Sequence, residues 1–125
     1  MTYKFTNAIV RKPNKSIHNA LSSQYLHPSY EKILEIHDNY INSIEEAGLN
    51  IILLDSLEKY PDSIFVEDPA LIFKNNIIIL KPSEFTRKDE AIIIKKEISK
   101  YFEKIFIVEK GAIEGGDILL SLIHI

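Results

Sequence analysis

Residues 29–54, SYEKILEIHDNYINSIEEAGLNIILL, predict one helix followed directly by one strand, and this pair decides the fold class. Ser29 has the side chain of a helix N-cap, and apolar residues then recur about every 3.6 positions as far as Ile44. Gly48 stands where a helix usually ends. The uninterrupted apolar run at residues 50–54 is typical of a strand buried on both faces.

The rest of the chain repeats the combination of helix and strand with a period of about fifty residues. Further strands are expected at residues 7–11, 64–66, 70–73, 77–80, 105–108 and 118–120. Residues 12–28 are expected to form an irregular loop, and Thr86 to cap a second helix over residues 87–102. Asn75 and Asn76 predict a hairpin turn, because Asn tolerates positive φ. The sequence therefore predicts an α/β protein.

Length and charge exclude several classes of function. The 125 residues make one domain or a piece of one, and the net charge of −3 gives no basic surface for nucleic acid. The apolar runs are too short to span a bilayer, so no membrane partner is expected. The N-terminal residues lack a basic stretch followed by a long apolar one, which makes a cytoplasmic location the expectation.

The chain contains no cysteine, so it carries no disulfide, no thiolate zinc ligand and no cysteine nucleophile. Its histidines show no metal-site spacing, and neither a metal nor a cofactor is expected. His37 falls on the inner face of the first helix, where a packing role is expected. His18 and His27 are expected at the surface, and His124 lies in the C-terminal tail.

Three acidic residues stand out by their position in PDSIFVEDP, residues 61–69. Asp62, Glu67 and Asp68 bracket a short apolar run that is expected to be buried. Buried carboxylates need a cation, a donor or a metal as partner. A guanidinium group would fit, because its planar N–H donors match a carboxylate. The alternative is that Asp62 caps a turn and Asp68 precedes a proline in an exposed hairpin.

Several segments resemble, in order, the dimethylarginine dimethylaminohydrolase family of the guanidino-group-modifying superfamily. These segments are TNAIVRKP, LSSQYLHPSYEKILEIHDNYINSIEEAGLNIILLD, PDSIFVEDP, LKPSEFTRKDE and IEGGDIL. The resemblance covers residues 3 to about 120, and PDSIFVEDP is its most specific motif. It implies an α/β propeller, or pentein fold, built of ββαβ units, of which residues 1–120 would be the N-terminal part.

The resemblance also implies roles for individual residues. Asp62, Glu67 and Asp68 match acidic substrate-binding positions, and Phe65 matches an aromatic residue that lines the same pocket. Leu21 matches a lid residue. Arg87 matches an arginine that binds the amino-acid end of the substrate, although the paired arginine of the family is Lys88 here. Glu114 matches the acid that orients a catalytic histidine.

In this family a cysteine thiolate attacks the guanidinium carbon, an amine leaves, and water releases citrulline. The implied partner is a methylated arginine, and a homodimer is expected for the full-length enzyme. The nucleophile is missing from this chain, and the tail at residues 121–125 departs from the family pattern and is expected to be non-native. Two other interpretations stay open: an arginine deiminase-like enzyme, and a non-catalytic domain that binds arginine-like ligands.

Overall fold

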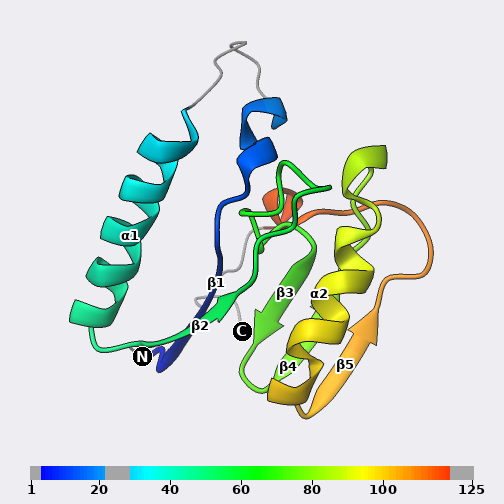
Figure 1. The fold of residues 1–125 in the computed structure, drawn as a ribbon. Helices are drawn as coiled ribbons and strands as arrows, with labels where there is room; N and C mark the ends of the chain where they lie inside the picture. The colour runs from blue at the N-terminus through cyan, green and yellow to red at the C-terminus, as the bar shows by residue number, and fades with distance from the viewer. Residues whose placement is uncertain (1–3, 22–28, 119–125) are drawn as a thin grey trace. The chain divides into compact units, whose positions relative to one another are not determined.

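A computed structural model describes residues 4–21 and 29–118 of the chain. The chain forms two compact units, Met1–Phe65 and Val66–Ile125. Each unit has its own sheet and its own α-helix (Figure 1). The acidic segment 61–69 extends across the boundary between the units, so Asp62 belongs to the first unit and Asp68 to the second.

The first unit is a strand–helix–strand arrangement. Its elements are β1 (Asn7–Arg11), α1 (Tyr30–Glu46) and β2 (Asn50–Leu54). The two strands are parallel, with Asn7 paired to Asn50 and Arg11 to Leu54. Parallel neighbours need a crossover connection, and α1 supplies it (Figure 1). The bounds of both strands are those that the sequence predicts.

Both ends of α1 are capped as the sequence predicts. The hydroxyl of Ser29 accepts a hydrogen bond from the backbone N–H of Lys32 at 3.3 Å. At the other end Gly48 has a φ of 87°, and its N–H and that of Leu49 bind the last carbonyls of the helix. His37 is buried as expected, whereas Tyr40, which falls in the same periodic apolar pattern, is 56% exposed.

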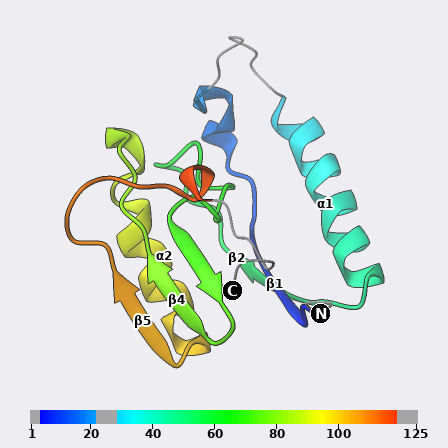
Figure 2. The same ribbon diagram turned by 180° about the vertical axis from the view of Figure 1, so that it is seen from behind.

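The second unit is a complete ββαβ unit. Its elements are β3 (Ala70–Phe73), β4 (Asn76–Ile79), α2 (Glu90–Ile98) and β5 (Lys104–Ile107). The middle strand β4 pairs with β3 in the antiparallel sense and with β5 in the parallel sense. As in the first unit, a helix connects the parallel strands; Figure 2 shows α2 beside β4 and β5.

The core of the second unit comes from alternate positions of β4 and from one side of α2. Ile77 and Ile79 are 0% and 3% exposed, and Ile94 and Ile98 of the helix are equally buried. Each fully buried isoleucine stabilises the unit by about 1.5–3 kcal/mol relative to an exposed one. This packing fixes the ends of β4 and α2, where the polar residues described below are found.

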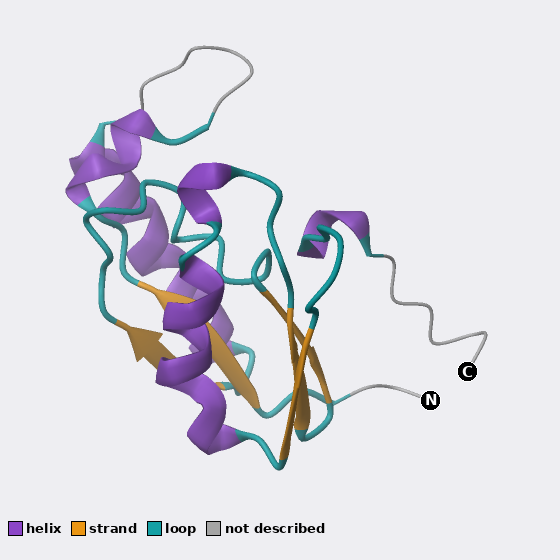
Figure 3. Ribbon diagram, turned by 90° about the vertical axis from the view of Figure 1, so that its right-hand side faces the viewer, coloured by secondary structure: helices purple, strands orange, loops and turns teal. Residues whose placement is uncertain are grey.

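Residues 55–69 form neither helix nor strand, as Figure 3 shows, so the expected strand at residues 64–66 is wrong. The backbone turns there instead: the N–H of Ser63 donates to the carbonyl of Tyr60, and the N–H of Phe65 to that of Asp62. These turn bonds use the donors that a sheet would need. The acidic segment is therefore a loop that follows β2 and precedes β3.

Three further boundaries differ from expectation. The second helix begins at Glu90 rather than after Thr86, because residues 85–87 and 99–101 form 3₁₀ turns at either side of it. The hairpin turn after β3 has its positive φ, 54°, at Lys74 rather than at an asparagine. The loop before α1 contains a 3₁₀ helix at Lys15–Asn19. The strand expected at residues 118–120 lies largely outside the described residues.

The two units repeat a short sequence as well as an arrangement. Residues 7–13, NAIVRKP, contain β1, and residues 76–82, NIIILKP, contain β4. Asn, Ile, Lys and Pro recur at the same places in the two segments. In each unit a 3₁₀ helix follows the Lys-Pro pair, and a parallel strand follows the next α-helix. β1–α1–β2 therefore corresponds to β4–α2–β5.

Candidate functional site

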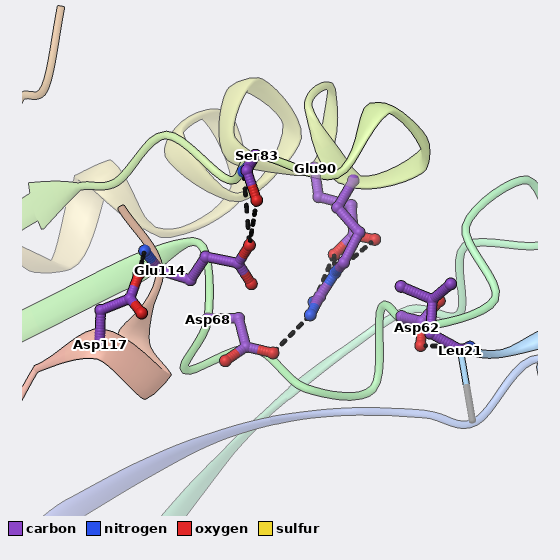
Figure 4. Close-up of polar contacts among 8 residues, drawn as sticks. Leu21, Asp62, Asp68, Ser83, Glu90, Glu114 and Asp117 are labelled. Atoms are coloured by element: carbon purple, nitrogen blue, oxygen red, sulfur yellow. Dashed lines mark hydrogen bonds and ion pairs between the residues drawn. The ribbon is translucent and has the colours of Figure 1, made fainter. Parts of the chain in front are cut away.

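The second unit holds a buried cluster of three charged side chains, Asp68, Arg87 and Glu90 (Figure 4). Asp68 comes from the loop before β3, Arg87 from the 3₁₀ turn after β4, and Glu90 from the first position of α2. One terminal nitrogen of Arg87, Nη1, donates to Oδ2 of Asp68. The other, Nη2, donates to Oε2 of Glu90 at 2.9 Å, and Nε binds the same carboxylate at 3.3 Å.

The ion pairs of Arg87 are strong because its side chain and that of Glu90 are largely shielded from water. The side chains of Arg87 and Glu90 are 5% and 4% exposed, whereas that of Asp68 is 23% exposed. Burial alone would lower the pKa of Arg87, but the hydrogen bonds and charges of Glu90 and Asp68 outweigh it and raise the pKa above its ordinary value. Removing one partner of such a buried ion pair costs about 3–5 kcal/mol, since it leaves a charge buried without compensation.

Glu114 lies in the second unit, in a tight turn that follows β5. Its carboxylate oxygen Oε1 accepts hydrogen bonds from the N–H and the hydroxyl of Ser83, at 3.3 and 3.0 Å (Figure 4). The backbone N–H of Glu114 donates to Asp117 at 3.1 Å, which closes a capping box around the 3₁₀ helix at Gly115–Asp117. The acid is thus fixed between two loops that follow β4 and β5.

The turn at Glu114 also holds the loop that carries Asp68. The N–H of Gly115 donates to the carbonyl of Asp68 at 3.0 Å. The approach is so close that a Cβ on Gly115 would lie 2.3 Å from the carbonyl oxygen of Glu67. Only glycine fits at this position without a backbone shift. Two of the expected site residues, Asp68 and Glu114, are therefore connected through the backbone of one turn.

In the first unit Asp62 is 5% exposed, and its Oδ1 accepts a hydrogen bond from the backbone N–H of Leu21 at 3.0 Å (Figure 4). The Leu21 side chain itself is 58% exposed, and Phe65 is 47% exposed. The segment that follows Leu21 in the expected lid, residues 22–28, lies outside the described residues. Glu67, in the second unit, is exposed. The expected site residues of the first unit thus include one buried acid and two exposed apolar side chains.

Two residues in these contacts are not identified by the sequence analysis. Glu90 follows Arg87 by three positions, a spacing that brings side chains together at the start of a helix, and this was the available signal. Asn14 is fully buried, and its amide donates to the carbonyl of Tyr60 and to the hydroxyl of Ser63, both at 3.0 Å. No sequence pattern distinguishes Asn14 from an ordinary loop asparagine.

The charged cluster of the second unit is acidic overall. Asp68 and Glu90 supply two negative charges and Arg87 one positive charge, so the cluster keeps a net negative charge. Among residues 4–21 and 29–118, no group of three or more His, Asp and Glu side chains is arranged to hold a metal ion. Within the same residues no helix combines the length and the apolar character needed to cross a membrane.

Curated proteins with similar sequences include dimethylarginine dimethylaminohydrolases. The N(G),N(G)-dimethylarginine dimethylaminohydrolase of Pseudomonas aeruginosa is 36% identical over 119 residues, which are 93% of this chain and 47% of the relative. The Streptomyces coelicolor enzyme of the same name is 28% identical, over 90% of this chain and 45% of the relative. The chain spans about half the length of the curated relatives it matches. No protein-family model matches it.

Comparison with solved structures gives the same result as comparison of sequences. A mutant of the Pseudomonas aeruginosa enzyme complexed with citrulline superposes with a TM-score of 0.91 at 35% identity, over 96% of this chain and 48% of that one. A dimethylarginine dimethylaminohydrolase adduct with S-methyl-L-thiocitrulline gives a TM-score of 0.90 at the same identity. The N-terminal domain of ArgZ, an arginine dihydrolase from cyanobacteria, shares the fold alone, with a TM-score of 0.74 at 14% identity.

These matches confirm the predicted fold class, a partial α/β propeller built of ββαβ units. The complete unit that this class requires is β3–β4–α2–β5. The likeness extends over nearly the whole chain, but over only half of each relative. In sequence and in fold alike, the chain is a homologue of about half of an N(G),N(G)-dimethylarginine dimethylaminohydrolase.

Proposed function

We propose that this chain is the N-terminal, substrate-holding part of a hydrolase that converts N-methylated arginine and water to citrulline and a methylamine or dimethylamine. The observation that carries the proposal is the 36% identity over 93% of the chain to an enzyme with that name. A cysteine thiolate would attack the guanidinium carbon, the amine would leave, and water would release citrulline from the enzyme. Since this chain has no cysteine, the nucleophile comes from the remainder of the protein.

The acids of the chain would hold the substrate cation. Asp68 is the candidate for direct contact with the guanidinium, because a carboxylate has several acceptor sites and Arg87 engages Oδ2. Asp62, Phe65 and Glu67 are further candidates for contact with the substrate, because each matches a substrate-binding position of the family. Glu114 would orient the histidine that serves as general acid and base, with its own position set by Ser83.

The proposal also includes the location of the protein in the cell and its oligomeric state. We infer a cytoplasmic enzyme, because a reducing compartment keeps a reactive cysteine from forming disulfides. A homodimer belongs to the same proposal, and sedimentation of the full-length protein tests it. A monomer at micromolar concentration would contradict that part of the proposal alone.

The activity is tested in two steps. The nucleotide sequence downstream of the Asp117 codon should encode a histidine and a cysteine in frame, and it also tests whether residues 121–125 are natural. The longer protein is then incubated with dimethylarginine, monomethylarginine and arginine, and citrulline is measured. Citrulline from the methylated substrates but not from arginine is the expected result. Turnover of arginine alone would favour a deiminase, and binding without turnover would favour an arginine-binding domain.

A matched pair of variants tests whether Asp68 of this chain contributes to substrate binding. Asp68→Asn removes the charge of a partly buried acid, whereas Asp89→Asn removes the charge of an exposed one. Losing a charge-assisted hydrogen bond of about 1.5–3 kcal/mol should raise KM of the Asp68→Asn variant by at least about tenfold. Asp89→Asn should change KM by less than about twofold. Equal effects of the two variants would refute the role of Asp68.

A further inference from the structure

Asn14 is a completely buried polar residue of the first unit. It precedes the 3₁₀ helix at Lys15–Asn19, where an asparagine ordinarily caps the helix with its side-chain oxygen, but the structure shows no such capping bond. The amide nitrogen donates instead to the loop after β2, to the carbonyl of Tyr60 and to the hydroxyl of Ser63, each at 3.0 Å. The side chain therefore joins two loops that are far apart in the sequence.

A third contact fixes the orientation of the Asn14 amide. Its oxygen Oδ1 accepts a hydrogen bond from the hydroxyl of Ser16 at 2.7 Å, so the donor end and the acceptor end of the amide are both matched. An aspartate of the same shape could not donate, and its carboxylate oxygen would face the Tyr60 carbonyl. An apolar side chain would leave buried polar groups of the two loops without these bonds. The position therefore requires the chemistry of an amide.

The two acceptors of Asn14 are the first and the last residue of one turn. The N–H of Ser63 donates to the carbonyl of Tyr60 at 3.0 Å, which closes a β-turn with Pro61 and Asp62 as its central residues. Proline restricts φ at the first central position, and Asn14 holds the turn at both ends. Asp62, which is 5% exposed, is thus carried by a short turn that is anchored twice.

Asp62 in turn binds the loop from which Asn14 comes. Its Oδ1 accepts a hydrogen bond from the N–H of Leu21 at 3.0 Å (Figure 4). Between Asn14 and Leu21, the side chain of Ile17 is 5% exposed and anchors the 3₁₀ helix in the unit. A displacement of the turn would therefore change the position of the Asp62 carboxylate and of the Leu21 backbone together.

We propose that Asn14 is a positioning residue for substrate binding, which holds the turn at residues 60–63 so that the Asp62 carboxylate and the Leu21 backbone keep a fixed mutual position. Because Asn14 is fully buried, it does not contact the substrate itself. The effect on affinity rests on the proposed function, in which Asp62 is a candidate for contact with the substrate. The effect on the Leu21 amide can be measured without any substrate.

The test uses the full-length enzyme and the variants Asn14→Ala, Ser63→Ala, the combination of the two, and Asn19→Ala. The last is the control, because it removes the same side chain from an exposed position of the neighbouring 3₁₀ helix. KM and kcat are measured for dimethylarginine. The hydrogen-exchange rate of the Leu21 amide is measured by NMR in the absence of substrate.

Asn14→Ala should raise KM by about tenfold, equivalent to about 1.4 kcal/mol, with kcat within about threefold of the wild type. Ser63→Ala removes one of the two bonds to the turn and should raise KM by about threefold; it serves as the test if Asn14→Ala is too unstable to assay. The double variant should match Asn14→Ala within about twofold, because both changes remove the same contact. Asn19→Ala should behave as the wild type.

The exchange rates separate positioning from a general loss of stability. In Asn14→Ala the Leu21 amide should exchange at least about tenfold faster, because local opening of the turn breaks its bond to Asp62. The amide of Asn50 donates to the carbonyl of Thr6 at 2.9 Å, at the start of the sheet of the same unit, and should keep its rate. A general destabilisation of the unit would accelerate both amides.

Three results would overturn the inference. The first is an Asn14→Ala variant, or in its place a Ser63→Ala variant, with the KM and the Leu21 exchange rate of the Asn19→Ala control. The second is equal acceleration of the Leu21 and Asn50 amides, and the third is a faster Leu21 amide with an unchanged KM. Failure of the proposed function is distinct: the wild-type enzyme would then release no citrulline from dimethylarginine, whereas the exchange rates would still show whether Asn14 holds the turn.

Discussion

Replacing Gly115 by alanine should move the loop that carries Asp68. A Cβ at this position would lie 2.3 Å from the carbonyl oxygen of Glu67, 3.0 Å from its carbonyl carbon and 3.3 Å from Cα of Asp68. A comfortable carbon–oxygen separation is about 3.3–3.6 Å, so the two backbone segments must move apart by roughly 1 Å. All three neighbours are backbone atoms, which cannot relieve the overlap by changing a rotamer.

The cost follows from two contributions. Forcing an extra methyl group into a packed position costs about 1–3 kcal/mol. The shift also weakens the 3.0 Å hydrogen bond from Gly115 to the Asp68 carbonyl, which contributes about 0.5–1.5 kcal/mol. Alanine restricts the unfolded chain more than glycine does and returns about 0.4–1 kcal/mol. A net loss of about 1–3 kcal/mol in the free energy of unfolding is expected.

The neighbouring Gly116 provides the control. No atom of the described residues lies within 4 Å of a Cβ built there, so Gly116→Ala should be neutral or stabilise the protein by up to about 1 kcal/mol. Urea unfolding of both variants, followed by circular dichroism in the far ultraviolet, measures the difference. In the full-length enzyme Gly115→Ala should also raise KM, because Asp68 moves with its backbone. Two variants within about 0.5 kcal/mol of each other would refute the close approach.

Three other predictions concern the folding stability of the two units. Burial lowers the pKa of His37 below 6.5, although Asp38 and the backbone of Arg11 act in the opposite direction. The unfolded chain therefore binds the proton first, and the free energy of unfolding should fall as pH decreases below about 6.5. His37→Gln should reduce this pH dependence, measured by urea unfolding at a series of pH values. Ser29→Ala should cost about 1 kcal/mol in unfolding free energy by removing the cap of α1, whereas Ser43→Ala within the same helix should cost less than about 0.5 kcal/mol. Ile94→Ala should cost about 2–5 kcal/mol, and Ile92→Ala, at a 57% exposed position of the same helix, should cost far less; similar losses for both would contradict the packing of α2.

The parts of the fold that the sequence predicts well are those controlled by local patterns. The strands at residues 7–11 and 50–54 and the capped helix between them agree with the structure because apolar periodicity, Ser29 and Gly48 act within a few residues. The run at residues 64–66 has the composition of a strand, but the N–H of Phe65 in its middle donates to the carbonyl of Asp62 in a turn. Composition cannot distinguish these two outcomes in a segment this short.

For the site, the sequence identifies the acids but not their partners. PDSIFVEDP indicates the loop and its carboxylates, and Arg87 is identified as a site residue, but its contacts with Asp68 and Glu90 are not predicted because they depend on where α2 begins. Thr86 resembles a cap, yet the 3₁₀ turn at residues 85–87 directs Arg87 inward to Glu90 and Asp68. A charged pair three residues apart is usually solvated, and only the packing of the unit shows that this pair is buried.

The correspondence between the two units extends to the polar residue after each Lys-Pro pair. In the first unit Asn14 holds the carbonyl of Tyr60, in the loop after β2, and in the second unit Ser83 holds Glu114, in the loop after β5. Duplication of one ancestral segment would produce this agreement in sequence, topology and loop attachment together. The loop that bears Asp62 and the turn that bears Glu114 would then be divergent copies of a single loop. An evolving site could acquire different acids in each copy while inheriting the same means of anchoring them.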